Sequence, residues 1–201
     1  MPMTMTAETH RAIEQARHPE LARFLNDHAI LRGSFTLVSG RKSTYYCDGK
    51  QASFSGEGLA LITEAILKEL EGVDANAIGG MDMGATPIVA AVALRAQQAG
   101  RALPAFVVRK DVKAHGTKKE IEGICPESAQ QLVIVDDVIT SGGSTITAIE
   151  AVRRTGREVS LVLSVLDRES GGREALEAIG VRYQPLVTIS DLGLTNNEPT
   201  D

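Results

Sequence analysis

The stretch from Leu132 to Thr145 constrains the fold of this chain more than any other part of it. Four consecutive apolar residues, a pattern typical of a strand buried on both faces, lead into the carboxylates Asp136 and Asp137. Small residues follow and open a helix, namely Thr140, Ser141, Gly142, Gly143 and Ser144. Because these side chains leave the backbone accessible, successive N–H groups there can bind a phosphate at the positive end of the helix. The sequence therefore predicts a strand, an acid pair and a phosphate-binding loop.

Two carboxylates beside such a loop need partners other than the phosphate. The partners we expect for Asp136 and Asp137 are ribose hydroxyls or a hydrated Mg²⁺ that the ligand carries. A buried strand followed by a Ser-capped helix, without any ligand, is the structural alternative. A purely structural turn requires neither paired acids nor five small residues in succession. The run also lacks the Gly-Lys-Ser/Thr ending of a P-loop, which disfavours nucleoside triphosphate hydrolysis.

This stretch resembles the motif with which type I phosphoribosyltransferases bind phosphoribosyl diphosphate (PRPP). The resemblance implies that PRPP contacts the residues Asp136, Asp137, Val138, Ile139, Thr140, Ser141, Gly142, Gly143 and Ser144. It also implies the α/β fold of that family, a mainly parallel twisted sheet flanked by helices with a small N-terminal hood.

Composition limits the kind of protein that this chain can be. With 201 residues, of which 43% are hydrophobic, it is long enough for one good core and short for two domains. The formal net charge of -5 argues against nucleic acid as a partner. No apolar run approaches the length of about 18 residues that spans a membrane, and the N-terminus lacks a secretory pattern. Cys47 and Cys125 lie far apart, so we expect reduced thiols in a cytoplasmic protein.

Helical and strand-like segments alternate along the chain, which predicts a parallel sheet with helices on both faces and ligand loops at the carboxyl ends of the strands. The expected strands are 75–80, 104–108, 132–135, 160–166 and 183–189. The expected helices are 8–31 with a break near Pro19, 87–99, 144–155, 174–179 and one that carries Leu59, Ile62, Ile66 and Leu70 and ends at Gly72.

Two of these helices lead to further expectations. Leu31 is expected on the apolar face of the first, and helix 87–99, apolar nearly all round, is expected to be central or packed against a partner subunit. We expect a single domain over 1–201, with a hood over roughly 20–50 and a PRPP-binding core over roughly 55–190.

Residues 33–48 read as two short strands joined by a Ser-Gly turn, which is the pattern of a hairpin. The segment resembles the N-terminal hood of orotate phosphoribosyltransferases, where a Phe-x-Leu-x-Ser-Gly-x-x-Ser-x-Tyr run covers the pyrimidine. The resemblance implies that Tyr46 and Cys47 lie near the orotate ring.

The loop 81–87, between a Gly pair and Pro87, fits a second anion-binding turn from a strand into a helix. The corresponding loop of type I phosphoribosyltransferases binds the diphosphate through backbone amides, which here implies Met83 and Gly84. Many members of the family carry Lys where Met83 aligns, and another Lys commonly stands where Val38 aligns.

The segment 109–123 is long, charged and without periodicity, which suggests a mobile functional lid rather than a solvated linker. Its cations Arg109, Lys110, Lys113 and His115 can converge on a polyanionic leaving group. Orotate phosphoribosyltransferases carry the same Arg-Lys-x-x-Lys-x-His-Gly pattern. The resemblance implies that these four residues are catalytic and that the lid of one subunit closes over the site of its partner in a homodimer.

An Asp-Arg pair follows the strand 160–166, and the family uses this Arg to hold the orotate carboxylate, which implies that role for Arg168. Thr140 is the other residue implied to contact the pyrimidine. The implied activity is transfer of the phosphoribosyl group from PRPP to orotate, giving orotidine 5′-monophosphate and diphosphate. Mg²⁺ is the implied cofactor, held through PRPP near Asp136 and Asp137 and not by a metal site of the protein.

Two other functions are compatible with parts of this pattern. A purine phosphoribosyltransferase would share the PRPP motif, but the hood and Arg168 favour a carboxylated pyrimidine. A PRPP-sensing regulator or RNA-binding attenuator would keep the pocket without turnover. The intact Lys113 and His115 and the net charge of -5 speak against a regulator.

Overall fold

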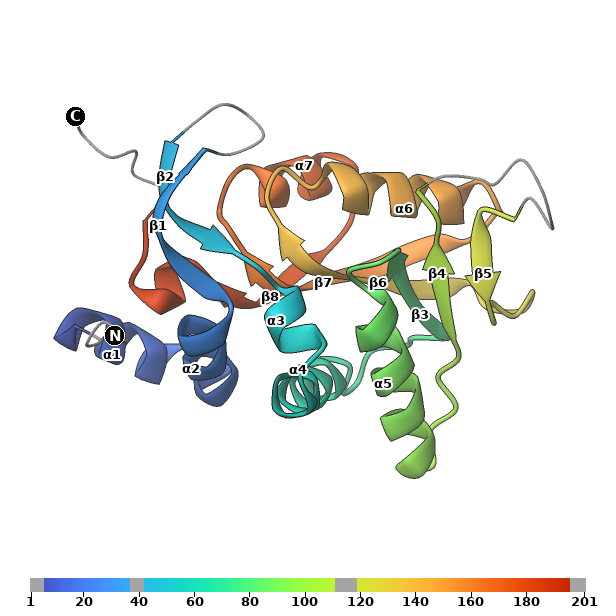
Figure 1. Cartoon of the computed structure of the whole chain (residues 1–201). Coiled ribbons are helices and arrows are strands. Elements are labelled where there is room, and N and C mark those ends of the chain that lie inside the picture. Colours follow the sequence, from blue (N-terminus) through green and yellow to red (C-terminus); the bar gives the residue numbers. More distant parts are fainter. Residues whose placement is uncertain (1–5, 37–41, 111–118, 196–201) are drawn as a thin grey trace.

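A six-stranded sheet forms the centre of this computed structural model, which describes residues 6–36, 42–110 and 119–195 (Figure 1). The strand order is β5-β4-β3-β6-β7-β8, and within this sheet only the β4–β5 pair is antiparallel among the described strands. The strands are β3 (Ala77–Met81), β4 (Ala105–Val108), β5 (Ile121–Gly123), β6 (Gln131–Ile139), β7 (Glu158–Asp167) and β8 (Tyr183–Thr188). The predicted mainly parallel α/β sheet is confirmed.

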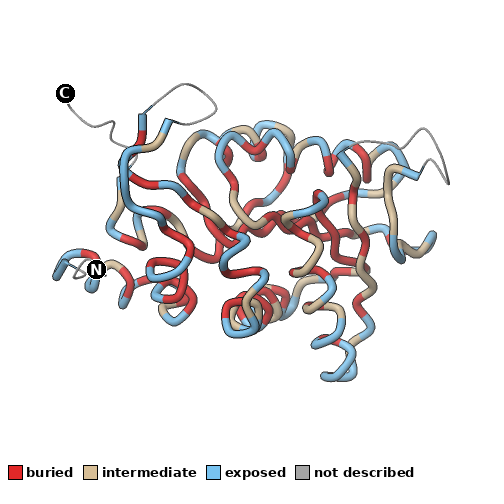
Figure 2. Tube along the Cα trace, in the orientation of Figure 1, coloured by how far each residue is buried: buried red, intermediate tan, exposed pale blue. Residues whose placement is uncertain are grey.

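Helices cover both faces of the sheet (Figure 1). One face packs against α4 (Gly56–Glu69) and α5 (Thr86–Gln98), and the other packs against α6 (Gly143–Arg153) and α7 (Gly172–Ala178). Alternate residues of β6 serve the two layers, since Val133 joins the α4 side and Leu132 joins the α6 side. Figure 2 shows the result, with buried residues concentrated along the central strands.

The N-terminal part consists of two helices and a hairpin. The helices are α1 (Ala7–Gln15) and α2 (Pro19–His28), the hairpin pairs β1 (Ile30–Thr36) with β2 (Lys42–Cys47), and the short helix α3 (Lys50–Ser53) follows. The predicted break near Pro19 is confirmed, because Pro19 occupies the first turn of α2. Leu31 was wrongly predicted as helical, since α2 ends at His28 and Leu31 lies 46% exposed in β1.

Helix α5 is not the central helix that was one of its two expectations, and the other, packing against a partner subunit, stays a prediction. Its buried residues, Ile88, Val89, Val92 and Ala96, lie on one face, while Leu94 is 63% exposed. Single-sequence periodicity missed α3, β5 and the 3₁₀ turn η1 (Ser190–Leu192), because each has only three or four residues. In the part of the chain that the structure describes, no helix has the length and apolarity needed to cross a membrane.

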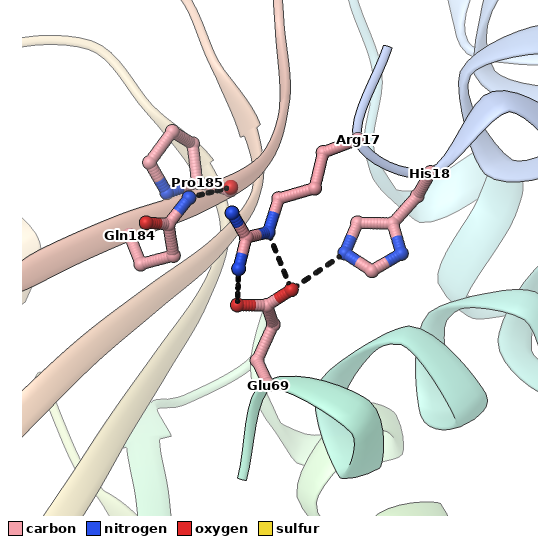
Figure 3. A network of polar contacts seen from close by, with 5 residues as sticks. All are labelled: Arg17, His18, Glu69, Gln184 and Pro185. Carbon is pink, nitrogen blue, oxygen red and sulfur yellow. Dashed lines mark hydrogen bonds and ion pairs between the residues drawn. The ribbon is translucent and has the colours of Figure 1, made fainter. Parts of the chain in front are cut away.

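A polar network fastens the turn between α1 and α2 to the end of α4 (Figure 3). Arg17 donates from Nε and Nη2 to the two carboxylate oxygens of Glu69, at 2.6 and 2.8 Å, and His18 Nε2 lies 3.0 Å from Oε1. Beside the network, the Gln184 amide donates to the Pro185 carbonyl at 2.9 Å on the edge strand β8. Pro185 suits an edge strand, where a missing N–H breaks no pairing on the outer side.

The pKa values of Glu69 and His18 are both lowered. Burial alone would raise the pKa of Glu69, but the hydrogen bonds and charges of Arg17 and His18 outweigh it and hold that pKa below its usual value. Burial lowers the pKa of His18, and the bond to Glu69 only partly opposes this. Between the folded and unfolded pKa of either group the unfolded chain binds more protons, so acidification removes stability.

We therefore expect His18 to make the fold acid-sensitive. The free energy of unfolding should fall as the pH drops below the ordinary histidine pKa of 6.5, and His18→Gln should lose less between about pH 7.5 and about pH 5.5 than the parent protein does. Urea denaturation at each pH measures this difference. His10→Gln, at an exposed position of α1, is the control and should behave like the parent. An equal loss in the parent and in His18→Gln would contradict the assignment.

Candidate functional site

The predicted phosphate loop lies at the carboxyl end of β6, near the middle of the sheet. The strand continues through both carboxylates to Ile139, so the acids lie within it and not after it. Thr140 and Ser141 are exposed, and Gly142 has a φ of 80°, which favours glycine, immediately before α6 begins. The first N–H groups of a helix have no partner within it, so this turn presents donors suited to an anion.

Gly172 packs against the other side of this loop. A Cβ atom at this position would lie 2.4 Å from the Ile139 side chain and 2.7 Å from the Thr140 carbonyl oxygen. The start of α7 therefore packs directly on the loop, and a larger residue would displace it.

Asp136 turns inward and fastens the loop to α6. Its Oδ2 accepts hydrogen bonds from Thr145 Oγ1 at 2.7 Å and Ser144 Oγ at 3.2 Å, and its Oδ1 accepts the N–H of Asp137 at 3.0 Å. Burial raises the pKa of Asp136 to about 6, the hydrogen bond from Thr145 opposes the rise and the charge of Asp137 adds to it. With 6% of its surface exposed, Asp136 is placed to position the loop.

Asp137 is less buried and faces two other segments. A Cβ atom at Gly84 would lie 2.5 Å from Asp137 Oδ1, and one at Gly49 would lie 3.1 Å from Oδ2. The carboxylate therefore lies between the segment that leaves the hood and the loop that follows β3. The two acids that the sequence treats as a pair have different surroundings.

The second predicted anion loop lies beside the first. A Cβ atom at Gly80 would lie only 2.1 Å from the Val135 carbonyl oxygen, so β3 approaches β6 more closely than any other residue would allow. In the loop, Thr86 Oγ1 donates to Asp82 Oδ1 at 2.8 Å, and the Asp82–Met83 peptide bond is cis. Met83 is 58% exposed. The structure thus brings the loop of Met83 and Gly84 to the acid pair.

The predicted lid follows β4 and ends in β5, and these two strands pair antiparallel. Arg109 donates its N–H to the Glu120 carbonyl at 2.9 Å and its Nη1 to Glu122 Oε1 at 2.6 Å. Lys110 is exposed. Lys113 and His115 lie outside the described residues, as does Val38, so their predicted roles stay predictions. The pairing of Arg109 with Glu122 was not foreseen.

Arg168 lies next to the phosphate loop. Its N–H donates to the Ile139 carbonyl at 2.9 Å, and its guanidinium carbon lies 5.2 Å from the centre of the Tyr45 ring. Strand β2 alternates, so Tyr45 and Cys47 point inward while Tyr46 is 45% exposed and contacts Phe35 at 5.9 Å between ring centres. Cys47 therefore lies on the inward face of β2, within the electrostatic influence of Arg168, and Tyr46 lies on the outward face.

Tyr45 is the residue near Arg168 that sequence reasoning missed. The period-two alternation of β2 could have identified it, since it places Tyr45 on the face of Cys47. Burial raises the pKa of the Cys47 thiol to about 11, opposed by the charge of Arg168, so the thiol is neutral near pH 7.

The described residues offer oxygen donors for a magnesium ion rather than a protein metal cage. Among residues 6–36, 42–110 and 119–195, no three His, Cys, Asp or Glu side chains gather closely enough to hold a metal ion. Asp82 lies in the loop after β3, and Asp137 lies in β6 against Gly84 of that loop. Carboxylates of this kind suit Mg²⁺, which commonly binds one or two of them together with water and substrate phosphates.

Comparison with known proteins gives a consistent result. No protein-family model matches the chain. The orotate phosphoribosyltransferase of Rhodopirellula baltica is 41% identical over 181 residues, which cover 87% of this chain and 93% of that protein. Two crystal structures of the Mycobacterium tuberculosis orotate phosphoribosyltransferase cover 89% of this chain and 99% of theirs. The complex with Fe(III) dicitrate has a TM-score of 0.77 at 38% identity, and the complex with PRPP has a TM-score of 0.74 at 35% identity.

The hydrogen bond from Thr145 should hold the pKa of Asp136 down. Thr145→Val keeps the shape and removes the donor, so we expect that pKa to rise above its present value of about 6, by about one unit or more, since a hydrogen bond to a charged group contributes about 1.5–3 kcal/mol. Carbon NMR of the labelled carboxyl group measures the shift. Ser144→Ala removes the longer bond and should have the smaller effect. An unchanged titration in Thr145→Val would show that this bond does not tune Asp136.

Proposed function

The chain belongs to the orotate phosphoribosyltransferase family, and from this premise we propose how its residues divide the reaction. The activity is transfer of the phosphoribosyl group from PRPP to orotate, giving orotidine 5′-monophosphate and diphosphate in pyrimidine biosynthesis. The observation that carries the assignment of residues is the convergence of two anion loops and Arg168 on the carboxyl end of β6. The loop 140–144 suits the 5′-phosphate of PRPP, the loop of Met83 and Gly84 suits its diphosphate, and Arg168 suits a carboxylate.

Loss of diphosphate from the anomeric carbon leaves positive charge on the ribose and negative charge on the leaving group. Catalysis then lies in positioning and electrostatic stabilisation, without a protein nucleophile. Asp137 is the carboxylate placed to accept hydrogen bonds from the ribose hydroxyls, while Asp136, bonded to Thr145, keeps the loop in the conformation that binds.

The 5′-phosphate binds to the loop 140–144. Its backbone amides, that of Ser144 included, and the hydroxyls of Thr140 and Ser141 supply hydrogen bonds, and the dipole of α6 adds attraction for the anion. Gly142 and Gly143 allow the phosphate to approach the backbone.

The diphosphate binds between the loop of Met83 and Gly84 and the lid. Backbone amides supply the first set of donors and the cations Arg109, Lys110, Lys113 and His115 the second. Each cation stabilises the transition state by about 2–4 kcal/mol if it behaves as an oxyanion donor does. Mg²⁺, bound through PRPP beside Asp137, would neutralise part of the diphosphate charge.

Orotate lies between the hood and Arg168. The guanidinium binds the orotate carboxylate in a bidentate pair, Thr140 contacts the pyrimidine, and Tyr46 and Cys47 belong to the covering hood. The geometry supports Cys47 more directly than Tyr46, because only Cys47 shares the inward face of β2 with Tyr45.

Three further proposals concern the whole molecule. The chain forms one domain with a hood over roughly 20–50 and a core over roughly 55–190, supported by a hydrophobic core to which residues of both parts contribute. It forms a homodimer, which the resemblance of its lid motif to that of orotate phosphoribosyltransferases implies. It acts in the cytoplasm, supported by the free thiols of Cys47 and Cys125.

The assignment of the acceptor predicts that purified protein with PRPP and Mg²⁺ consumes orotate and none of adenine, hypoxanthine or uracil. Arg168→Gln should raise the KM for orotate by about 10–100-fold, because a charge-assisted pair is lost, while the KM for PRPP stays nearly unchanged. Orotate absorbance and diphosphate release measure both values. Use of another base would refute the acceptor. An unchanged KM for orotate in Arg168→Gln would refute the role of Arg168.

The proposed role of the lid predicts that a lid variant loses turnover but still binds PRPP. Lys113→Ala should lower turnover by about 10²–10³-fold, as loss of an oxyanion donor does, and leave PRPP affinity measured by calorimetry largely intact. Mixing Lys113→Ala with Asp137→Asn should restore activity, because a mixed dimer combines an intact lid with an intact core. Failure to regain activity, although sedimentation shows mixed dimers, would refute the shared lid. Sedimentation showing only monomers would refute the dimer.

A further inference from the structure

The backbone around Arg168 is fixed by contacts on both sides. Its own N–H is bonded to β6, and the next residue, Glu169, donates its N–H to Asp167 Oδ1 at 2.8 Å. Glu169 has a φ of 49°, and its Oε2 accepts hydrogen bonds from Ser190 N–H at 3.0 Å and Ser190 Oγ at 2.6 Å. A non-glycine residue in this region is uncommon and is often found at functional sites. The Cα position of Arg168 is therefore well defined.

A defined Cα position does not fix the guanidinium, since an arginine side chain has four rotatable bonds. Ordering such a chain costs about 1.5–2 kcal/mol of rotamer freedom. A site that binds a planar carboxylate at two oxygens needs the guanidinium plane already oriented. A contact on the side chain itself has to supply that orientation.

Tyr45 supplies such a contact. It is 2% exposed on β2, its ring faces the guanidinium at 5.2 Å, and Arg168 hydrogen-bonds to it. Ser43 fixes the Tyr45 backbone, because Ser43 Oγ donates to the Tyr45 carbonyl at 2.7 Å and accepts its N–H at 3.3 Å. A ring in this position favours a cation near its face.

Two neighbours of Arg168 on β2, Tyr45 and Cys47, carry no charge of their own near pH 7. Burial raises the pKa of Tyr45, and the hydrogen bond from Arg168 only partly opposes this, so the phenol is neutral. The Cys47 thiol is neutral as well. A phenol ring and a thiol orient the guanidinium without cancelling its charge, which a carboxylate in the same place would do.

We propose that Tyr45 is a positioning residue that orients the guanidinium of Arg168 toward a ligand carboxylate, and thereby sets the preference of the site for a carboxylated pyrimidine. This inference rests on the proposed function of Arg168. It assigns to the hood a part in substrate selection beyond covering the ring, since Tyr45 belongs to the hood and Arg168 to the core.

The experiment compares orotate with orotamide, in which a neutral amide replaces the carboxylate. The readout is the inhibition constant of orotamide divided by the KM for orotate, together with the KM for PRPP and the Tm. Tyr45→Leu removes the ring, and we expect the KM for orotate to rise by about 3–30-fold, with the constant for orotamide and the KM for PRPP nearly unchanged. Tyr45→Phe keeps the ring, loses the hydroxyl and should give an intermediate ratio.

Tyr183→Leu is a matched control. Tyr183 is buried on β8 and its ring faces Arg173 at 5.1 Å, so this variant removes a similar ring-guanidinium contact. We expect it to lower the Tm and to leave the ratio of the orotamide inhibition constant to the orotate KM unchanged. If Tyr45 were only a packing residue, Tyr45→Leu would weaken both ligands equally or lower the Tm alone. That result would overturn the proposal, and Tyr45→Phe decides the matter if Tyr45→Leu does not fold.

Arg168→Gln distinguishes a failure of the proposed role of Arg168 from a failure of the proposed role of Tyr45. It should abolish the preference for orotate, and adding Tyr45→Leu to it should cause no further loss of preference, because the residue to be positioned is gone. If Arg168→Gln keeps the preference, the proposed function of Arg168 fails. If Arg168→Gln loses the preference and both Tyr45 variants keep it, only the role of Tyr45 fails.

Discussion

The last four residues of β6 place the two anion loops, the end of the hood and Arg168, because they contact all of these segments. Asp136 is bonded to the first turn of α6, Asp137 lies against the loop after β3, Val138 lies against the end of the hood, and Ile139 supports both α7 and the N–H of Arg168. The supporting contacts are those of Thr145, Gly84, Gly49, Gly172 and Arg168. A parallel strand in the middle of a sheet has neighbours on both sides and helices on both faces, so its end is the point where such contacts can meet.

The close packing that positions the site residues lowers the stability of the fold. Burial of Asp136 raises its pKa to about 6, which means that the folded chain carries an acid whose charged form is disfavoured. Glycines at 49, 80, 84 and 172 give up side-chain packing so that backbones and the acid pair approach closely. Such losses are typical of binding sites, where the ligand supplies the missing contacts and charge. The Arg17–His18–Glu69 network lies elsewhere in the fold and contributes to holding the N-terminal helices on the core.

The sequence predicted the sheet, the breaks between helices and the position of both anion loops, because periodicity and small residues are local signals. It did not predict which acid of the pair points inward, because Asp136 and Asp137 differ only in the face of β6 they occupy, and that depends on α6 and its Thr145. It did not predict the pairing of Arg109 with Glu122, which joins residues on separate strands. Tyr45 was missed because the hood residues near orotate were assigned from the family resemblance alone, without the alternation of inward and outward side chains along the predicted strand.

The exposed Met83 gives the diphosphate loop a different balance of charge from that of family members with Lys at this position. Without that Lys, the loop offers Gly84, its backbone amides and the Asp82 carboxylate bonded to Thr86. Backbone amides bind an anion through fixed partial charges, which are weaker than a full cation but cost no side-chain ordering. Under the proposed function, neutralising the departing diphosphate then depends more on the cations predicted for the lid and on Mg²⁺. The charge proposed to stabilise the leaving group would thus lie on the segment 109–123, separate from the residues proposed to bind the ribose and its phosphate.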